Sequence, residues 1–238
     1  MPAQPPDIAS LPAVLPPIAK AVARPEGPLS FSSVLAGLGT GLTLFTGAPV
    51  ASQLALPFCA PFLVGGETVA AADGANCFNL YRLTEWAKRK RIGSPALLNR
   101  LRIARAFTCF QLATILDHMG SEMERHHATR LVITGLPDCL YDEELSEPEA
   151  RSTFARCRAS LHRLAAQSTV LAFADLPPHP IGGRIRFFDS LVALARSVYE
   201  VSGTEPAMFV PVFVPVKAPG LITAAKGGSS YGKDSAYR

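Results

Sequence analysis

The residues that come closest to a known chemical device lie between positions 46 and 56, where the sequence reads TGAPVASQLAL. A loop that binds phosphate groups has the pattern G-x-x-x-x-G-K-[S/T]: glycines let the backbone wrap the phosphates, the lysine neutralises charge and the hydroxyl holds the metal. Residues 46–49 are typical of the start of such a loop, and residues 53–56 of the helix that follows it. The stretch between them is two residues short and has no lysine.

What remains at this turn is an incomplete nucleotide site. Asp73, at the end of the next apolar run, is the one acidic group left at a strand end that faces the same cleft. It could hold a ligand or a water molecule, but an aspartate that caps the turn Asp73-Gly74 is the simpler interpretation. The residues assigned to the degenerate site are Gly47, Ala48, Pro49, Val50, Ala51, Ser52, Gln53 and Asp73.

No second constellation of chemical groups emerges from the sequence. The histidines lack a third ligand at metal-like spacing, and no nucleophile turn such as G-x-S-x-G is present. Acidic residues gather at 138–149, where a solvated loop is the more frequent explanation than a metal site. The five cysteines form no C-x-x-C pair and indicate a reducing compartment. We expect no catalytic residue and no metal site.

The elements that position these residues alternate between short apolar runs and longer stretches with apolar residues at every third or fourth position. Strands are predicted over residues 42–45, 68–72, 101–107, 130–134 and 169–174. Helices are predicted over residues 54–64, 79–92, 108–124, 148–167 and 188–201. This order predicts an α/β fold with a mostly parallel central sheet and helices on both faces, whose ligands bind beyond the carboxyl ends of the strands.

Composition divides the chain into three parts. Residues 1–28 contain eight prolines and predict a flexible arm, 29–216 form the core domain, and 217–238 are predicted to be a flexible tail. The most apolar stretches are interrupted by proline and too short to span a membrane, so we expect a soluble, cytoplasmic protein without a membrane partner. A net charge of +4 permits contact with polyanions but does not require it.

Several segments of the chain resemble a known family. Residues 104–107, Ala-Arg-Ala-Phe, followed by Gln111-Leu112, are similar to a strand end and helix start in the archaeal and eukaryotic branch of the RecA superfamily of recombinases and its paralogues. Residues 72–78, ADGANCF, look like the family's IDTEGTF segment, and residues 130–134 like the strand that ends in its magnesium-binding aspartate. The resemblance covers about two thirds of the chain and implies a RecA-like P-loop NTPase fold.

The positions at which this sequence differs from the family decide which activity we expect. The family's catalytic glutamate falls on Ala75, its metal aspartate falls on Thr134, and its phosphate-binding lysine has no counterpart. Phosphoryl transfer depends on positioning and charge neutralisation, so we expect a pseudo-ATPase with no cofactor. Weak ATP binding stays open, because a helix N-terminus near Ser52 offers backbone N–H groups.

Two basic segments are candidates for contact with DNA phosphates. Arg184 and Arg186 precede two phenylalanines that could stack on bases, although a glycine turn leading into a helix is an alternative explanation. Four successive basic residues lie at the end of the helix predicted over residues 79–92. The alternative to DNA contact is that they are simply exposed to solvent at that helix end. These four residues are Lys88, Arg89, Lys90 and Arg91.

Three functions of different class remain at this stage. The first, which we favour, is an accessory or regulatory factor in DNA recombination or repair, with a recombinase or repair factor as protein partner and DNA as a second ligand. The second is a divergent RecA-like ATPase that still binds or hydrolyses ATP. The third is a RecA-fold interaction protein such as a cell-division inhibitor. A homo-oligomer is compatible with each of them.

Overall fold

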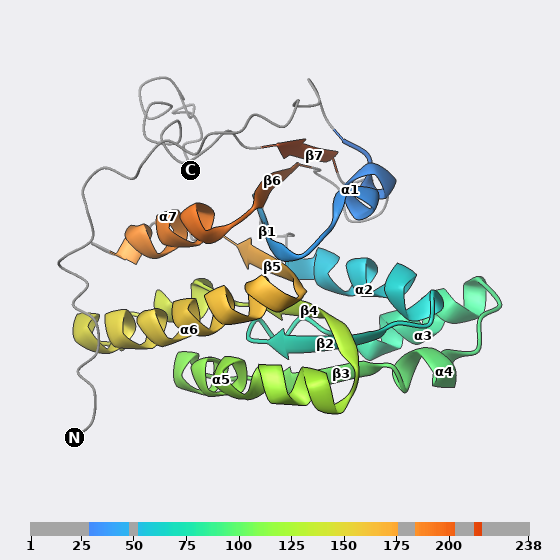
Figure 1. The fold of residues 1–238 in the computed structure, drawn as a ribbon, viewed down its shortest axis with the longest axis horizontal. Helices are drawn as coiled ribbons and strands as arrows, with labels where there is room; N and C mark the ends of the chain where they lie inside the picture. Colours follow the sequence, from blue (N-terminus) through green and yellow to red (C-terminus); the bar gives the residue numbers. More distant parts are fainter. Residues whose placement is uncertain (1–28, 48–51, 176–183, 203–211, 216–238) are drawn as a thin grey trace, which may run out of the picture.

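The structure is a computed structural model that describes residues 29–47, 52–175, 184–202 and 212–215 (Figure 1). The predicted arm at 1–28 and tail at 217–238 lie outside the described residues. So do four positions of the degenerate nucleotide site: Ala48, Pro49, Val50 and Ala51.

The described strands form one seven-stranded sheet in the order β3-β2-β4-β5-β1-β6-β7. All neighbouring strands pair in parallel except β6 and β7, which are antiparallel. The prediction of an α/β fold with a mostly parallel sheet is therefore confirmed. The strands are β1 (Gly41–Gly47), β2 (Thr68–Asp73), β3 (Leu101–Arg105), β4 (Ala128–Thr134), β5 (Thr169–Asp175), β6 (Ser197–Ser202) and β7 (Val212–Pro215).

Helices pack against both faces of this sheet because successive strand residues point to opposite sides. In β5, for example, Val170 and Ala172 belong to the core shared with α5, α6 and α7, whereas Leu171 and Phe173 belong to the core shared with α1 to α4. The helices are α1 (Phe31–Gly37), α2 (Ala55–Val64), α3 (Leu80–Arg89), α4 (Ser94–Leu98), α5 (Cys109–Arg125), α6 (Glu147–Gln167) and α7 (Ile185–Leu194), with short 3₁₀ turns η2 (Ser52–Leu54) and η3 (Asp138–Leu140).

Aromatic packing holds the α2 face of the sheet together. The Phe45 ring of β1 lies 4.8 Å from that of Phe173 in β5 and 4.6 Å from that of Phe58 in α2. Phe213 brings β7 into the same group, 5.8 Å from both Phe45 and Phe58. Rings of this size bury large apolar areas, so β7 is tied to the core although it is a short edge strand.

Local sequence signals set the starts of the two longest described helices. The Thr108 side chain accepts a hydrogen bond from the backbone N–H of Gln111 and so caps α5. At α6, Ser146 and Glu149 form a capping box, with a proline in the first turn. Both helices begin within one residue of the positions predicted from the sequence.

The predicted helix over 188–201 is wrong in its second half. The helix α7 ends at Leu194, and residues 197–202 form β6, which pairs in parallel with β1. The sequence SVYEVS contains two valines and a tyrosine, which are residue types favoured in strands, so it suits a strand once β1 offers an unpaired edge. The predicted strand over 101–107 also ends earlier, at Arg105.

None of the helices in the described part of the chain combines the length and the apolar character needed to cross a membrane.

Candidate functional site

The turns predicted to carry chemistry meet at one edge of the sheet. In the sheet order, β2 pairs with β4, and β5 lies between β4 and β1. Because all four strands are parallel, their carboxyl ends and the turns that follow them share this edge. The structure therefore brings Asp73, Ala75 and Thr134 together, with Ser52 at the start of η2 close by.

Asp73 is fully buried at the centre of this edge. One carboxylate oxygen accepts from the Thr134 hydroxyl at 2.9 Å and from the backbone N–H of Cys77 at 3.0 Å. The other accepts from the backbone N–H of Phe78 at 3.2 Å and pairs with Arg105 Nε at 3.2 Å. A carboxylate has about four acceptor positions, so these donors occupy all of them. A ligand or metal could bind Asp73 only by displacing one of these partners.

Arg105 supplies the positive charge that a buried carboxylate needs. Besides Asp73, its guanidinium contacts the carbonyl oxygen of Phe78 at 3.1 Å. Arg105 ends β3, the neighbour of β2, and belongs to the Ala-Arg-Ala-Phe segment that carries the family resemblance. Its charge therefore stabilises the turn after β2.

Ala75 and Thr134, the positions that the resemblance would assign to a glutamate and a metal-binding aspartate, are tied directly to each other. The backbone N–H of Gly74 donates to the carbonyl oxygen of Thr134 at 3.0 Å, and that of Ala75 donates to the Thr134 hydroxyl at 3.3 Å. Gly135 adopts a φ of +78°, and a Cβ atom there would lie 2.3 Å from the carbonyl carbon of Gly74. The two turns thus pack backbone against backbone.

Cys77 connects this cluster to the turn after β1. Its thiol donates to the carbonyl oxygen of Ser52 at 3.3 Å and lies 3.7 Å from an oxygen of Asp73. Burial, together with the nearby charge of Asp73, raises the pKa of the Cys77 thiol to about 12. The thiol is therefore protonated at neutral pH and acts as a hydrogen-bond donor, not as a nucleophile. We call Asp73, Cys77, Arg105, Thr134 and Gly135 the strand-end cluster.

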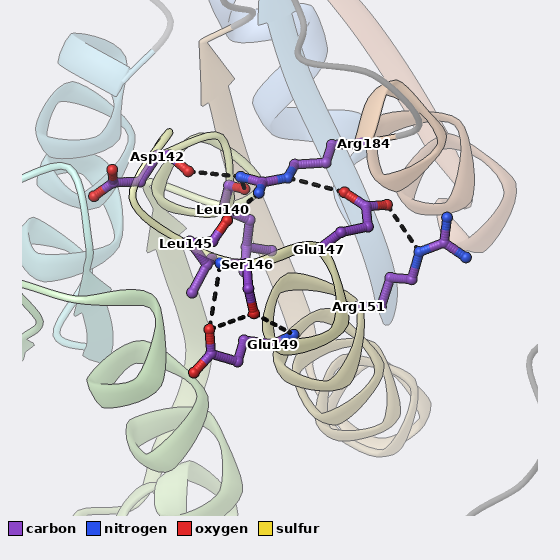
Figure 2. A network of polar contacts seen from close by, with 8 residues as sticks. All are labelled: Leu140, Asp142, Leu145, Ser146, Glu147, Glu149, Arg151 and Arg184. Atoms are coloured by element: carbon purple, nitrogen blue, oxygen red, sulfur yellow. Dashed lines mark hydrogen bonds and ion pairs between the residues drawn. The ribbon is translucent and has the colours of Figure 1, made fainter.

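The side chain of Arg184, one of the predicted DNA contacts, lies inside the protein. Arg184 is 4% exposed, and its guanidinium pairs with the Glu147 carboxylate at 3.1 Å. It also donates to the carbonyl oxygens of Leu140, Asp142 and Leu145 (Figure 2). The side chain therefore holds the loop between β4 and α6, and its charge is not presented at the surface.

The other predicted DNA contacts are at the surface. Arg186 is exposed on α7. The segment Lys88 to Arg91 is exposed at the end of α3, where Lys88 pairs with Glu85 at 3.0 Å. Figure 1 shows α3 and α4 on the side of the sheet away from its carboxyl edge. From α4 the chain continues into the start of β3, so the end of α3 lies toward the starts of the strands. The basic segment and the strand-end cluster therefore lie at opposite ends of the strands.

One feature of the carboxyl edge was missed by sequence reasoning. A groove of about 630 Å³ opens between the start of α5 and the loop that leads into α6, lined by Phe107, Phe110, Tyr141 and four acidic residues. The apolar pattern of the sequence predicts Phe107 within a strand, and the acidic residues are predicted to lie in a solvated loop. The signal that could have found the groove is Phe107-Thr108, an aromatic residue directly before a helix cap.

Metal chemistry has no support in the part of the chain that the structure describes. Nowhere in residues 29–47, 52–175, 184–202 and 212–215 do three or more His, Cys, Asp or Glu side chains gather as metal ligands would. The buried thiols of Cys59 and Cys139 have strongly raised pKa values because burial disfavours the thiolate. Four of the acidic residues at 138–149 line the groove: Asp138, Asp142, Glu144 and Glu149.

The chain was compared with known families and with curated proteins. No family model matches it, and no curated protein matches it. The fold is established as an α/β domain with a mostly parallel seven-stranded sheet.

Proposed function

We propose that this chain is a RecA-like domain that does not hydrolyse ATP and that acts as an accessory factor in DNA recombination or repair. In this proposal it works through a protein partner and through DNA. The observation that carries it is the saturated carboxylate of Asp73, which lies beside Ala75 and Thr134, the positions that the resemblance assigns to the groups for water and metal.

The convergence of three turns supports the RecA-like part of this proposal. The family resemblance implies that the phosphate loop, the catalytic glutamate and the metal aspartate share one site. In this fold the corresponding positions converge, because Ala75 and Thr134 are hydrogen-bonded and Cys77 reaches Ser52.

The chemistry of the cluster supports the loss of hydrolysis. Phosphoryl transfer is catalysed almost entirely by positioning and charge neutralisation. At the positions of the acid groups this chain has Ala75 and Thr134, which can neither activate water nor hold Mg²⁺ by a carboxylate. Asp73 and Arg105 neutralise each other. The cluster therefore serves as a structural support for the edge of the domain.

The first test is ATP turnover by the purified full-length chain. We expect no magnesium-dependent release of phosphate above that of a protein-free control, with and without single-stranded DNA. Turnover that depends on magnesium and disappears in Asp73→Asn would overturn the proposal in favour of a divergent ATPase. Asp73→Asn keeps the side-chain size, and its circular dichroism spectrum serves as the folding control.

The second test concerns DNA. Fluorescence anisotropy with a labelled single-stranded oligonucleotide should detect binding that weakens with rising salt, because phosphate contacts release counterions. Lys90→Glu/Arg91→Glu should weaken binding by roughly tenfold, since two cations become anions. The matched control is Arg125→Glu/Arg158→Glu, which makes the same charge change at exposed positions on α5 and α6. Equal losses in both variants would contradict a specific DNA contact at the end of α3.

The third test distinguishes a role in DNA recombination or repair from a role in another process such as cell division. A strain of the native host that lacks the gene should lose survival after DNA damage and regain it on complementation with the wild-type gene. Normal survival together with a defect in cell division would contradict the proposal and favour a RecA-fold interaction protein.

A further inference from the structure

The groove beside the start of α5 combines exposed aromatic surface with a defined volume. Phe107 is 74% exposed and Phe110 is 45% exposed, and both line this hollow of about 630 Å³. The size lies within the roughly 300 to 1,000 Å³ that is typical of binding pockets. Exposed aromatic residues that gather around a concavity mark interaction sites more often than scattered ones do. We call this feature the α5–α6 groove.

Every charged residue that lines the α5–α6 groove is acidic: Asp138, Asp142, Glu144 and Glu149. Among the ion pairs of the described residues, Asp142, Glu144 and Glu149 have no basic partner. Glu147, which lies outside the groove lining, is by contrast paired with both Arg151 and Arg184. The fold thus neutralises the Glu147 carboxylate behind the groove and leaves negative charge along the wall of the groove.

Groups inside the groove respond to this charge. Burial raises the pKa of Tyr141, and the nearby carboxylate of Asp138 raises it further. Burial likewise raises the pKa of Cys109, and Asp142 and Glu149 add to the effect. A negative field of this kind repels phosphate groups and attracts cations.

The acidic wall is held in place before any ligand arrives. Arg184 donates to the carbonyl oxygens of Leu140, Asp142 and Leu145, which lie along the loop that forms the wall (Figure 2). At the end of this loop Ser146 and Glu149 form the capping box of α6. A wall that is already ordered loses little conformational entropy when a partner binds.

We propose that the α5–α6 groove binds a segment of a partner protein in which an aromatic or aliphatic side chain is flanked by lysine or arginine. The apolar side chain packs against Phe107 and Phe110, and the flanking cations face Asp142, Glu144 and Glu149. Nucleic acid is disfavoured because the wall carries the same charge as phosphate. The inference concerns a surface separate from the strand-end cluster, so it stands whether or not the domain binds nucleotide.

The experiment selects a library of random short peptides against the immobilised full-length chain at physiological ionic strength. We expect the recovered peptides to be enriched in lysine and arginine next to aromatic or aliphatic residues. The strongest peptides are then synthesised, and their binding is measured by fluorescence anisotropy. Glu144→Lys and Phe107→Ser should each weaken binding about fivefold or more, because one removes a charge partner and the other an apolar contact.

Two matched controls isolate the groove. Glu143→Lys makes the same charge change at the neighbouring exposed position, which does not line the groove. Tyr81→Ser removes an aromatic side chain of the same 74% exposure on α3. Both controls should bind the peptides as the wild type does. Failure to recover any peptide, recovery of peptides without basic residues, or equal losses in variants and controls would overturn the proposal.

A second copy of this chain is the competing occupant, through its exposed basic segment at 88–91. Sedimentation of the wild type, Glu144→Lys and Lys90→Glu/Arg91→Glu distinguishes the two. A monomeric wild type agrees with a foreign peptide in the groove. Self-association that both variants abolish, and that a mixture of the two variants restores as a dimer, would assign the groove to a second copy and overturn the proposal.

Discussion

The strand-end cluster and the α5–α6 groove lie at the same carboxyl edge of one sheet, yet they use charge in opposite ways. In the cluster, Asp73 is buried and its four acceptor positions are filled from within the chain. In the groove, Glu144 and Asp142 are exposed and have no basic partner among the described residues. A carboxylate that is already satisfied supports the fold, whereas one left facing a cavity is available to a partner.

The largest expected effect breaks the cluster at its centre. Asp73→Ala should lower the free energy of unfolding by about 3–5 kcal/mol, because it leaves Arg105 and the Thr134 hydroxyl without their buried partner. Chemical denaturation measures the change. The groove supplies the control: Glu144→Ala removes an exposed carboxylate and should change stability by no more than about 0.5 kcal/mol. Similar values for the two variants would remove the distinction between the regions.

The next prediction tests the backbone contact between the turns after β2 and β4. Gly135→Ala should lower the free energy of unfolding by about 2 kcal/mol or more, because the φ of +78° disfavours alanine and the new Cβ would lie 2.3 Å from Gly74. Gly93→Ala is the matched control, since a Cβ there meets nothing within 4 Å. Thermal or chemical denaturation of both variants measures the difference in stability. A Gly135→Ala protein as stable as Gly93→Ala would contradict the close approach of Gly135 to the backbone of Gly74.

The smallest expected effect concerns the support behind the groove and depends on pH. Hydrogen bonds from Arg151, and also from Arg184, lower the pKa of the Glu147 carboxyl from its ordinary value of 4.5. A lowered pKa in the folded state adds stability above pH 4.5 that is lost as the pH falls through the folded value. Because Glu147 is partly exposed, solvent screens the effect to about 0.5 kcal/mol or less.

Glu147→Gln should therefore be less stable than the wild type near neutral pH, and the difference should shrink as the pH falls below 4.5. Denaturant unfolding at a series of pH values measures this difference. The control is Glu143→Gln, an exposed carboxylate in the loop that precedes α6. A difference that grows on acidification would show that the charge of Glu147 does not stabilise the folded state.

The sequence predicted the frame of both regions well. Five apolar runs predicted five of the strands, and the Thr108 and Ser146 caps allowed the starts of α5 and α6 to be placed within a residue. These signals are local, because a cap or an apolar run acts over a few neighbouring residues. The absent lysine and the alanine at position 75 are equally plain in the sequence.

The roles of single charged residues could not be predicted in the same way. Arg184 and Arg186 are two positions apart and looked equivalent, yet Arg184 is enclosed by the loop at 140–147 and Arg186 is exposed. The difference arises from contacts between segments far apart in the chain. For the same reason the α5–α6 groove, which joins residues 107–110 to residues 138–149, has no local signature.

The sequence alone determined the alternation of strands and helices and the absence of a complete phosphate-loop pattern after the first strand, because both depend only on residue type and spacing. The tertiary structure decided that residues 197–202 extend as a strand along β1, that Asp73 is saturated and that Glu144 faces an open groove. These outcomes depend on which distant segments meet. A charged side chain supports the fold or faces a ligand according to the partners that folding brings within hydrogen-bonding distance.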